Sequence, residues 1–463
     1  MQRSNLKFLV NRALCSLFVL CLPLAAQAAP GDLDPSFGTG GKRVLAYDFG
    51  GDNIDRAFKI IVDGSSSYVI GDASTSPTSG TTTITRLQSN GQIDGSYGVN
   101  GTVKVGDLNG AVGWLDLVNG ALQTDGKLVL VGRGNFAGNT DMLACRFNAS
   151  GARDLAFGAQ GNGCRRIGFD LVANGHDAAS AVAIQPNGSI VIAGAATWDA
   201  KSASSRMAIA RLTSTGFPDF GFGVGGKTTV AFDHWKSAWS VAMAVDPSGR
   251  ILIAGNVEEM ELSPCDMDFA AVRLLSNGTL DTQGFSGGKF VQGFDLGPTV
   301  DGCDYHTDYL NGMALQADGS ILLGGSASFS STFDFAAAVM KLKPNGTLDP
   351  TFGNNGRVFH TACDVCLASN FYAFKVQPDG KMLLGGATIV DGFLYDFVIM
   401  RLTPNGQTDD SFQGGHTFVS FDNMPNESSD FPFSIGLQFG RPIIVGTKEI
   451  GTSSDIAIVR LQN

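Results

Sequence analysis

The chain has 463 residues, a formal charge of −11 and 61 glycines. Because binding to nucleic acid depends on an excess of lysine and arginine, this charge argues against a nucleic-acid partner. The acidic residues are mostly aspartate, which favours turns and caps, and few segments show a helical period. The composition therefore indicates an all-β protein with many turns.

The first 28 residues are predicted to be a secretory signal peptide. Arg3, Lys7 and Arg12 form a basic start, residues 13–25 are mostly apolar, and residues 26–28 have the small-x-small pattern of a cleavage site. This apolar run is too short for a membrane span. We therefore expect export to the periplasm or the extracellular space, with no membrane span. Loss of these three basic residues would take the formal charge to −14.

Residues 29–463 are predicted to form one domain built from a repeat of about 60 residues. One aspartate position recurs at intervals of 60 to 68 residues, as Asp34, Asp94, Asp154, Asp219, Asp281, Asp349 and Asp409. Most copies are followed three residues later by an aromatic residue, as Asp349 is by Phe352. Because the position occurs seven times, we interpret the aspartate as a turn cap and the aromatic as packing between repeats, not as catalytic groups.

Each repeat predicts four short strands. In one repeat they cover residues 240–245, 251–254, 269–274 and 288–294, and turns rich in glycine, asparagine and aspartate join them. Such strands are typical of an antiparallel meander. A single meander cannot bury both of its faces, whereas copies arranged around an axis can, so the period predicts a β-propeller.

The two ends of the chain predict how the ring closes. Residues 455–461 match the third strand of a repeat, and the first repeat begins in its middle, with a turn at 31–38 and a fourth-strand candidate at 42–49. We expect the N-terminal strand to complete the last blade. The predicted fold is a single seven-bladed β-propeller of four-stranded antiparallel blades.

The repeat resembles the delta-60 repeat family of β-propellers, which is found in exported bacterial proteins. The matching residues are the Asn-Gly-x-Leu-Asp-x-x-Phe-Gly-x-x-Gly element at 345–356, its partial copy at 31–41, and the Asp-Gly-Lys turns at 125 and 379. The resemblance implies a propeller fold and export. It brings no catalytic residues, and we leave these unassigned.

The loops from strand four to the next strand one are expected to surround the channel mouth and to carry function. The tight turns are expected to form the opposite face, without a functional site. Four of the five histidines fall in these loops beside aspartates. The candidate ligand-binding residues are His176, Asp177, His234, His306, Asp308 and His360. Such residues could hold a divalent cation, calcium or zinc, with a bound water as nucleophile. Alternatively, they are simply the polar residues of exposed loops.

Six cysteines follow the signal segment, and export implies an oxidising compartment. Proximity in the sequence suggests three disulfide pairs: Cys145 with Cys164, Cys265 with Cys303, and Cys363 with Cys366. For the last pair, a redox or metal-binding role is the alternative to a structural one.

Two functions are compatible with these features. The first is an exported, monomeric propeller that binds a protein, a glycan or a small ligand on its channel face without catalysis. The second is a metal-dependent hydrolase or lactonase-like enzyme that uses the histidines and aspartates of the loops. The fold alone does not decide between them.

Overall fold

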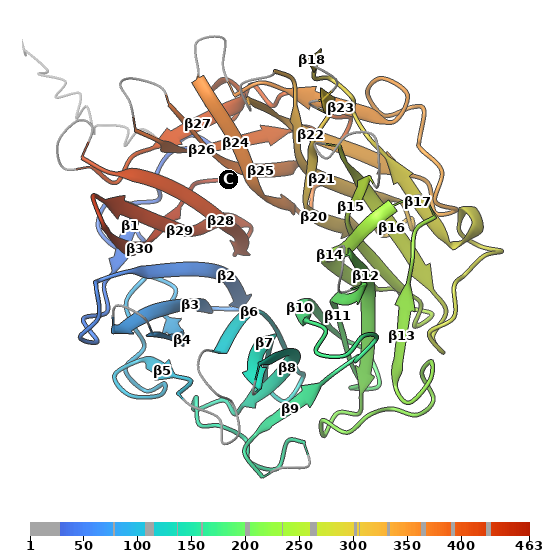
Figure 1. Cartoon of the computed structure of the whole chain (residues 1–463). Coiled ribbons are helices and arrows are strands. Elements are labelled where there is room, and N and C mark those ends of the chain that lie inside the picture. The colour runs from blue at the N-terminus through green and yellow to red at the C-terminus, as the bar shows by residue number, and fades with distance from the viewer. Residues whose placement is uncertain are drawn as a thin grey trace, which may run out of the picture.

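In the computed structural model, seven four-stranded antiparallel sheets surround a central axis, which confirms the predicted seven-bladed β-propeller (Figure 1). The structure describes residues 28–76, 79–106, 115–136, 138–158, 161–199, 204–233, 235–259, 266–300, 303–304, 306–330, 334–362, 367–389, 394–422 and 427–463. The predicted signal peptide thus lies almost entirely outside the described residues.

Blades one to seven follow the chain, and each has its first strand nearest the axis. The innermost strands are β2 (Asp55–Asp63), β6 (Leu115–Leu122), β10 (Asp177–Ile184), β14 (Trp235–Val245), β20 (Asp308–Leu315), β24 (Leu367–Val376) and β28 (Ser429–Gln438). The second strands are β3 (Ser66–Ser76), β7 (Leu128–Phe136), β11 (Ile190–Asp199), β15 (Ile251–Glu259), β21 (Ile321–Ser328), β25 (Met382–Ile389) and β29 (Arg441–Ile450).

The third strands are β4 (Ser79–Leu87), β8 (Asn139–Phe147), β12 (Ser204–Leu212), β16 (Met267–Leu274), β22 (Phe335–Leu342), β26 (Asp396–Leu402) and β30 (Ser453–Arg460). The outermost strands are β5 (Thr102–Lys104), β9 (Cys164–Ile167), β13 (Lys227–Val230), β17 (Lys289–Gln292), β23 (Arg357–His360), β27 (His416–Val419) and β1 (Lys42–Leu45). The pair β18 (Thr299–Val300) and β19 (Cys303–Asp304) and the single turns η1 (Ser286–Gly288) and η2 (Gln413–Gly415) complete the described elements.

Blade seven joins the two ends of the chain, as predicted. Strand β1 pairs antiparallel with β30, with Lys42 opposite Val459, and the two strands lie side by side in Figure 1. Strand β1 is shorter than the predicted 42–49. It ends at Leu45 because the backbone N–H of Tyr47 donates to the carboxylate of Asp55 in blade one instead of to β30.

The core consists of apolar layers between neighbouring blades. Because side chains alternate along a strand, β7 sends Leu128 and Leu130 toward blade one and Val129 and Val131 toward blade three. The second and third strands of every blade are buried in this way. Burial on both faces explains their continuous apolar sequences.

In each repeat, the recurring aspartate forms an ion pair with a basic residue of the third strand. We call these two residues, together with the aromatic residue that follows the aspartate, the clamp. The seven pairs are Asp34–Arg460, Asp94–Arg86, Asp154–Arg146, Asp219–Arg211, Asp281–Arg273, Asp349–Lys341 and Asp409–Arg401. The second carboxylate oxygen caps the turn as predicted. For example, Asp34 Oδ1 accepts hydrogen bonds from the N–H and the hydroxyl of Ser36.

The aromatic residue of each repeat packs against the following blade. Phe37 lies against Gly91 of blade one, where an added Cβ would come within 2.8 Å of the ring. Gly91 also has a positive φ of 80°, so the turn requires glycine for two reasons. The Arg460 guanidinium lies 4.9 Å from the centre of the Phe37 ring and donates to the carbonyl of Ser89 in blade one. The clamp therefore links each blade to the next.

One predicted disulfide is present. Cys145 of β8 and Cys164 of β9 are directly opposite in the strand pairing and are bonded to each other. Cys265, Cys363 and Cys366 lie outside the described residues, and Cys303 begins β19. The bond at Cys145 secures the short outermost strand of blade two.

Candidate ligand-binding channel

The innermost strands enclose a cavity of about 1050 Å³ at the centre of the ring. All seven strands line it, over residues 59–62, 119–120, 181–182, 241–243, 311–315, 373–376 and 433–437. The turns 316–318 and 377–380 continue its wall in blades five and six. These turns join strands one and two and belong to the face on which the sequence analysis expected no function.

Small residues account for the width of the cavity. Each innermost strand has a register shift near its middle, as between Ala57 and Lys59 in β2. Beyond this shift, small residues line the wall at Gly120, Ala181, Ala242, Gly312, Ala314, Ala373 and Gly436. At the shift itself, larger side chains such as Tyr372 and Phe433 occur, with ring centres 5.8 Å apart. The hollow therefore occupies the half of the channel that follows the shift.

Two lysines line this cavity from different blades. Lys59 of β2 is half-buried, and Lys375 of β24 is exposed to the channel. The surrounding walls, together with the charge of Lys375, lower the pKa of Lys59 to about 8. Burial also lowers the pKa of Lys375. Within the described residues neither lysine forms an ion pair. The sequence analysis did not single out these two lysines.

Four aspartates at the start of innermost strands connect neighbouring blades. Their carboxylates accept the backbone N–H of an aromatic residue in the preceding blade, in the pairs Asp55–Tyr47, Asp177–Phe169, Asp308–Phe294 and Asp430–Phe421. Burial, together with the charges of neighbouring carboxylates, raises the pKa of Asp55, Asp177 and Asp430 to about 6. The candidate ligand residues Asp177 and Asp308 are thus buried packing groups.

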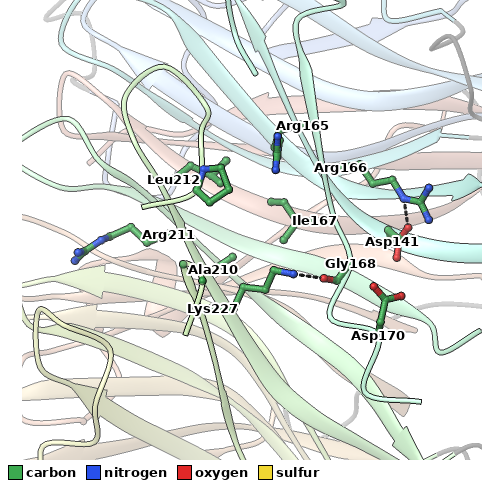
Figure 2. Close-up of a pocket in the computed structure, with 13 residues that line it drawn as sticks. Asp141, Arg165, Arg166, Ile167, Gly168, Asp170, Ala210, Arg211, Leu212 and Lys227 are labelled. Atoms are coloured by element: carbon green, nitrogen blue, oxygen red, sulfur yellow. Dashed lines mark hydrogen bonds and ion pairs between the residues drawn. The ribbon is translucent and has the colours of Figure 1, made fainter. Parts of the chain in front are cut away.

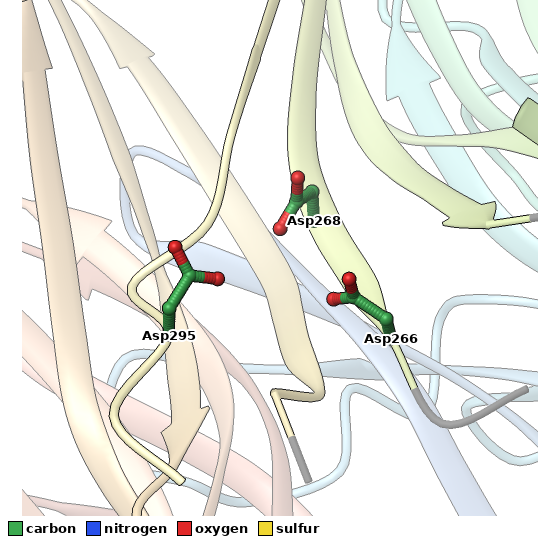
Figure 3. A group of neighbouring side chains, drawn as sticks. All are labelled: Asp266, Asp268 and Asp295. Atoms are coloured by element: carbon green, nitrogen blue, oxygen red, sulfur yellow. The ribbon is translucent and has the colours of Figure 1, made fainter. Parts of the chain in front are cut away.

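A group of three carboxylates lies beside Asp308. One oxygen each from Asp266, Asp268 and Asp295 lies within 4.8 Å of the others, and Figure 3 shows the three groups turned toward one another. An added Cβ on Gly293 would come within 2.2 Å of Asp268 Oδ1, so this glycine makes room for the group. An all-oxygen set suits calcium better than zinc, which prefers nitrogen and sulfur ligands.

Equivalent carboxylates occur between other blades, where basic side chains accompany them. Asp141 is paired with Arg166 next to Asp177, and the charges of Asp430, Asp396 and Asp422 act on Lys42. This recurrence favours a structural role for the acidic groups between blades.

The histidines do not form a shared site in the part of the chain that the structure describes. His176 is exposed, and His234 lies outside the described residues. Nε2 of His306 is 3.1 Å from the carbonyl of Gly297, and Nε2 of His360 is 2.8 Å from the carbonyl of Gly406. His360 belongs to an outermost strand, away from the axis. The one described group of three or more potential metal ligands contains no histidine.

A smaller groove of about 350 Å³ lies between blades two and three (Figure 2). Three of its four cations are engaged by the protein: Arg166 pairs with Asp141, Arg211 pairs with Asp219, and Lys227 donates to the carbonyl of Gly168. We therefore assign this groove to blade packing. Among the described residues no helix is long and apolar enough to cross a membrane.

A protein-family model matches four parts of the chain. Four segments, residues 123–157, 185–222, 316–352 and 377–412, match the family described as "Domain of unknown function (DUF5122) beta-propeller". Each segment runs from the turn after an innermost strand to the aromatic residue of the clamp. No curated protein sequence matches the chain.

Solved structures show a distant likeness. A protein of unknown function from Dyadobacter fermentans DSM 18053 is 12% identical over 74% of this chain and 93% of that chain, with a TM-score of 0.41. Trypanosoma rangeli sialidase in complex with sialic acid is 11% identical over 93% and 59%, with a TM-score of 0.39. The polysaccharide lyase Uly1 is 9% identical over 88% and 90%, with a TM-score of 0.42. At this distance the activities of these proteins do not transfer. The matched repeats and the ring of seven blades make the chain a β-propeller repeat protein.

Proposed function

We propose that this chain is an exported, non-catalytic binding protein that takes a small ligand into the centre of its ring. The observation that carries the proposal is the cavity of about 1050 Å³, to which all seven innermost strands contribute. Ligand pockets of proteins commonly have volumes of roughly 300–1,000 Å³, so the cavity is large enough for an organic molecule. Its walls are mostly apolar, and they include Asn119 and Asn311, whose amide nitrogens donate to backbone carbonyls of the next blade.

The alternative, a metal-dependent hydrolase or lactonase-like enzyme, has less support. Such an enzyme needs imidazoles or carboxylates that converge on an open position. His306 and His360 are each within hydrogen-bond distance of a backbone carbonyl, and Asp308 is fully buried. The cavity, by contrast, is open and lined by groups suited to recognition.

A cavity-filling variant tests the proposal. Ala242→Trp places an indole in the cavity, while Val99→Trp adds the same side chain at an exposed position and serves as the control. Compounds from a panel of organic acids, sugars and neutral metabolites should raise the melting temperature of the wild type and the control but not of Ala242→Trp. Mass spectrometry should recover each bound compound chemically unchanged. Equal stabilisation of all three proteins, or conversion of the compound, would contradict the proposal.

A further inference from the structure

The geometry points to a specific class of ligand: we propose that the cavity binds a small organic anion with two acid groups, held between Lys59 and Lys375. This inference rests on the proposed function, since it names the chemistry of the same site. Lys59 and Lys375 belong to innermost strands on either side of β28, and both line the one cavity.

The charge distribution of the cavity selects an anion. The whole chain has a formal charge of −11, yet its innermost strands present two ammonium groups to the cavity. The only acidic groups of the lining are Asp318 and Asp379, in the turns at its rim. Asp318 accepts hydrogen bonds from the N–H and the hydroxyl of Ser320, and Asp379 lies 3.8 Å from Lys381 Nζ. The rim carboxylates are thus engaged locally.

Two ammonium groups within one cavity repel each other, and that repulsion contributes to the lowered pKa of Lys59. A ligand with two anionic groups would neutralise both charges at once. The cavity is partly shielded from bulk water, so each of these interactions is stronger than on an open surface. A monoanion or a neutral ligand would leave one or both lysines uncompensated.

The shape and walls of the cavity favour an organic di-acid over an inorganic ion. A volume of about 1050 Å³ is many times that of a single sulfate or phosphate, and the lining that β28 contributes includes the exposed ring of Phe433 and Gly436. An organic frame would contact these apolar groups, while its acid groups reach the two ammonium groups.

Isothermal titration calorimetry with the di-acids succinate, glutarate and adipate tests this inference. The proteins are the wild type, Lys59→Gln, Lys375→Gln and the control Lys343→Gln, which alters an exposed turn lysine. At least one di-acid should bind the wild type and the control, with an affinity at least tenfold lower in each cavity variant. Binding should weaken between pH 7 and pH 9.5, because Lys59 loses its proton near pH 8. Succinamide, the neutral counterpart of succinate, should not bind.

Three results would overturn the inference: no binding of any di-acid, equal binding to all four proteins, or sulfate binding as tightly as the organic di-acids. Its failure can be separated from that of the proposed function. If a neutral compound stabilises the wild type but not Ala242→Trp, the channel remains the ligand site and only the anionic ligand class is wrong. If no compound distinguishes Ala242→Trp from Val99→Trp, both proposals fail.

Discussion

At the scale of single residues, the basic position of the seven clamps is filled by arginine or by lysine, and the two residues make different numbers of contacts. Arg273 is buried and donates through Nε to Asp281 at 2.8 Å and through Nη1 to the carbonyl of Pro344 in the next blade at 2.6 Å. Within the described residues, Lys341 in blade five makes only the ion pair, at 3.4 Å to Asp349. Arginine thus fixes both its own turn and the neighbouring blade, whereas lysine fixes only the turn.

This difference predicts opposite effects of two matched substitutions. Arg273→Lys should lower the free energy of unfolding by about 1–2 kcal/mol, because a charge-assisted hydrogen bond to the next blade is lost. Lys341→Arg should raise it by roughly 0.5–1.5 kcal/mol by adding the equivalent bond. Arg273→Ala should cost about 3–5 kcal/mol, since it leaves Asp281 buried without its cation. Denaturant midpoints measure all three, and an unchanged midpoint for Arg273→Lys would show that the inter-blade bond contributes nothing.

The sequence could predict the turn cap at these positions but not the whole clamp. The aspartate and the residues that it caps are two positions apart in the chain, so turn chemistry alone assigns its role. The basic residue recurs just as regularly, but its contact with the next blade joins residues about 60–70 positions apart. Only the folded ring shows that contact.

At the scale of the strand, blade seven depends on pairing between the two ends of the chain. Lys42 of β1 lies opposite Val459 of β30, and the same pair of positions in blade two is Cys145 and Cys164. The natural disulfide therefore marks a place where the strand geometry accepts a cross-link.

The double variant Lys42→Cys, Val459→Cys should form a disulfide that joins the terminal strands of the ring. Because this bond closes a loop of nearly the whole chain, oxidation should stabilise the protein, by about 2–4 kcal/mol if native geometry is kept. Thiol titration and melting curves with and without reductant measure both effects, with the single variant Lys42→Cys as the control. Free thiols in the folded, oxidised double variant would show that β1 does not pair with β30 in this register.

At the scale of the whole molecule, the sequence predicted the number of blades and the closure of the ring, but it did not indicate the cavity at the centre of the ring. The same turn residues occur once in each blade, so the number of copies in the sequence predicts the number of blades. The histidines were predicted from their chemistry, yet His360 lies on an outermost strand, and Nε2 of His306 is within hydrogen-bond distance of the carbonyl of Gly297 in the connection between blades four and five. The cavity is lined by seven separate strands, six of which contribute small residues, and these strands meet only in the ring. The one feature of the sequence that could have indicated this cavity is a lysine within an apolar strand, at Lys59 and again at Lys375.

The most direct test of a cationic channel at the centre of the ring is the pKa of Lys59. Modification with an amine-reactive reagent across a pH series, followed by peptide mass spectrometry, reports when each lysine loses its proton. Lys59 should be half-deprotonated near pH 8, and its pKa should rise in Lys375→Gln, because removal of the neighbouring charge favours the protonated form. If Lys59 instead titrates at the ordinary value of about 10.5 and does not respond to Lys375→Gln, the two lysines do not share a confined cavity and the account is contradicted.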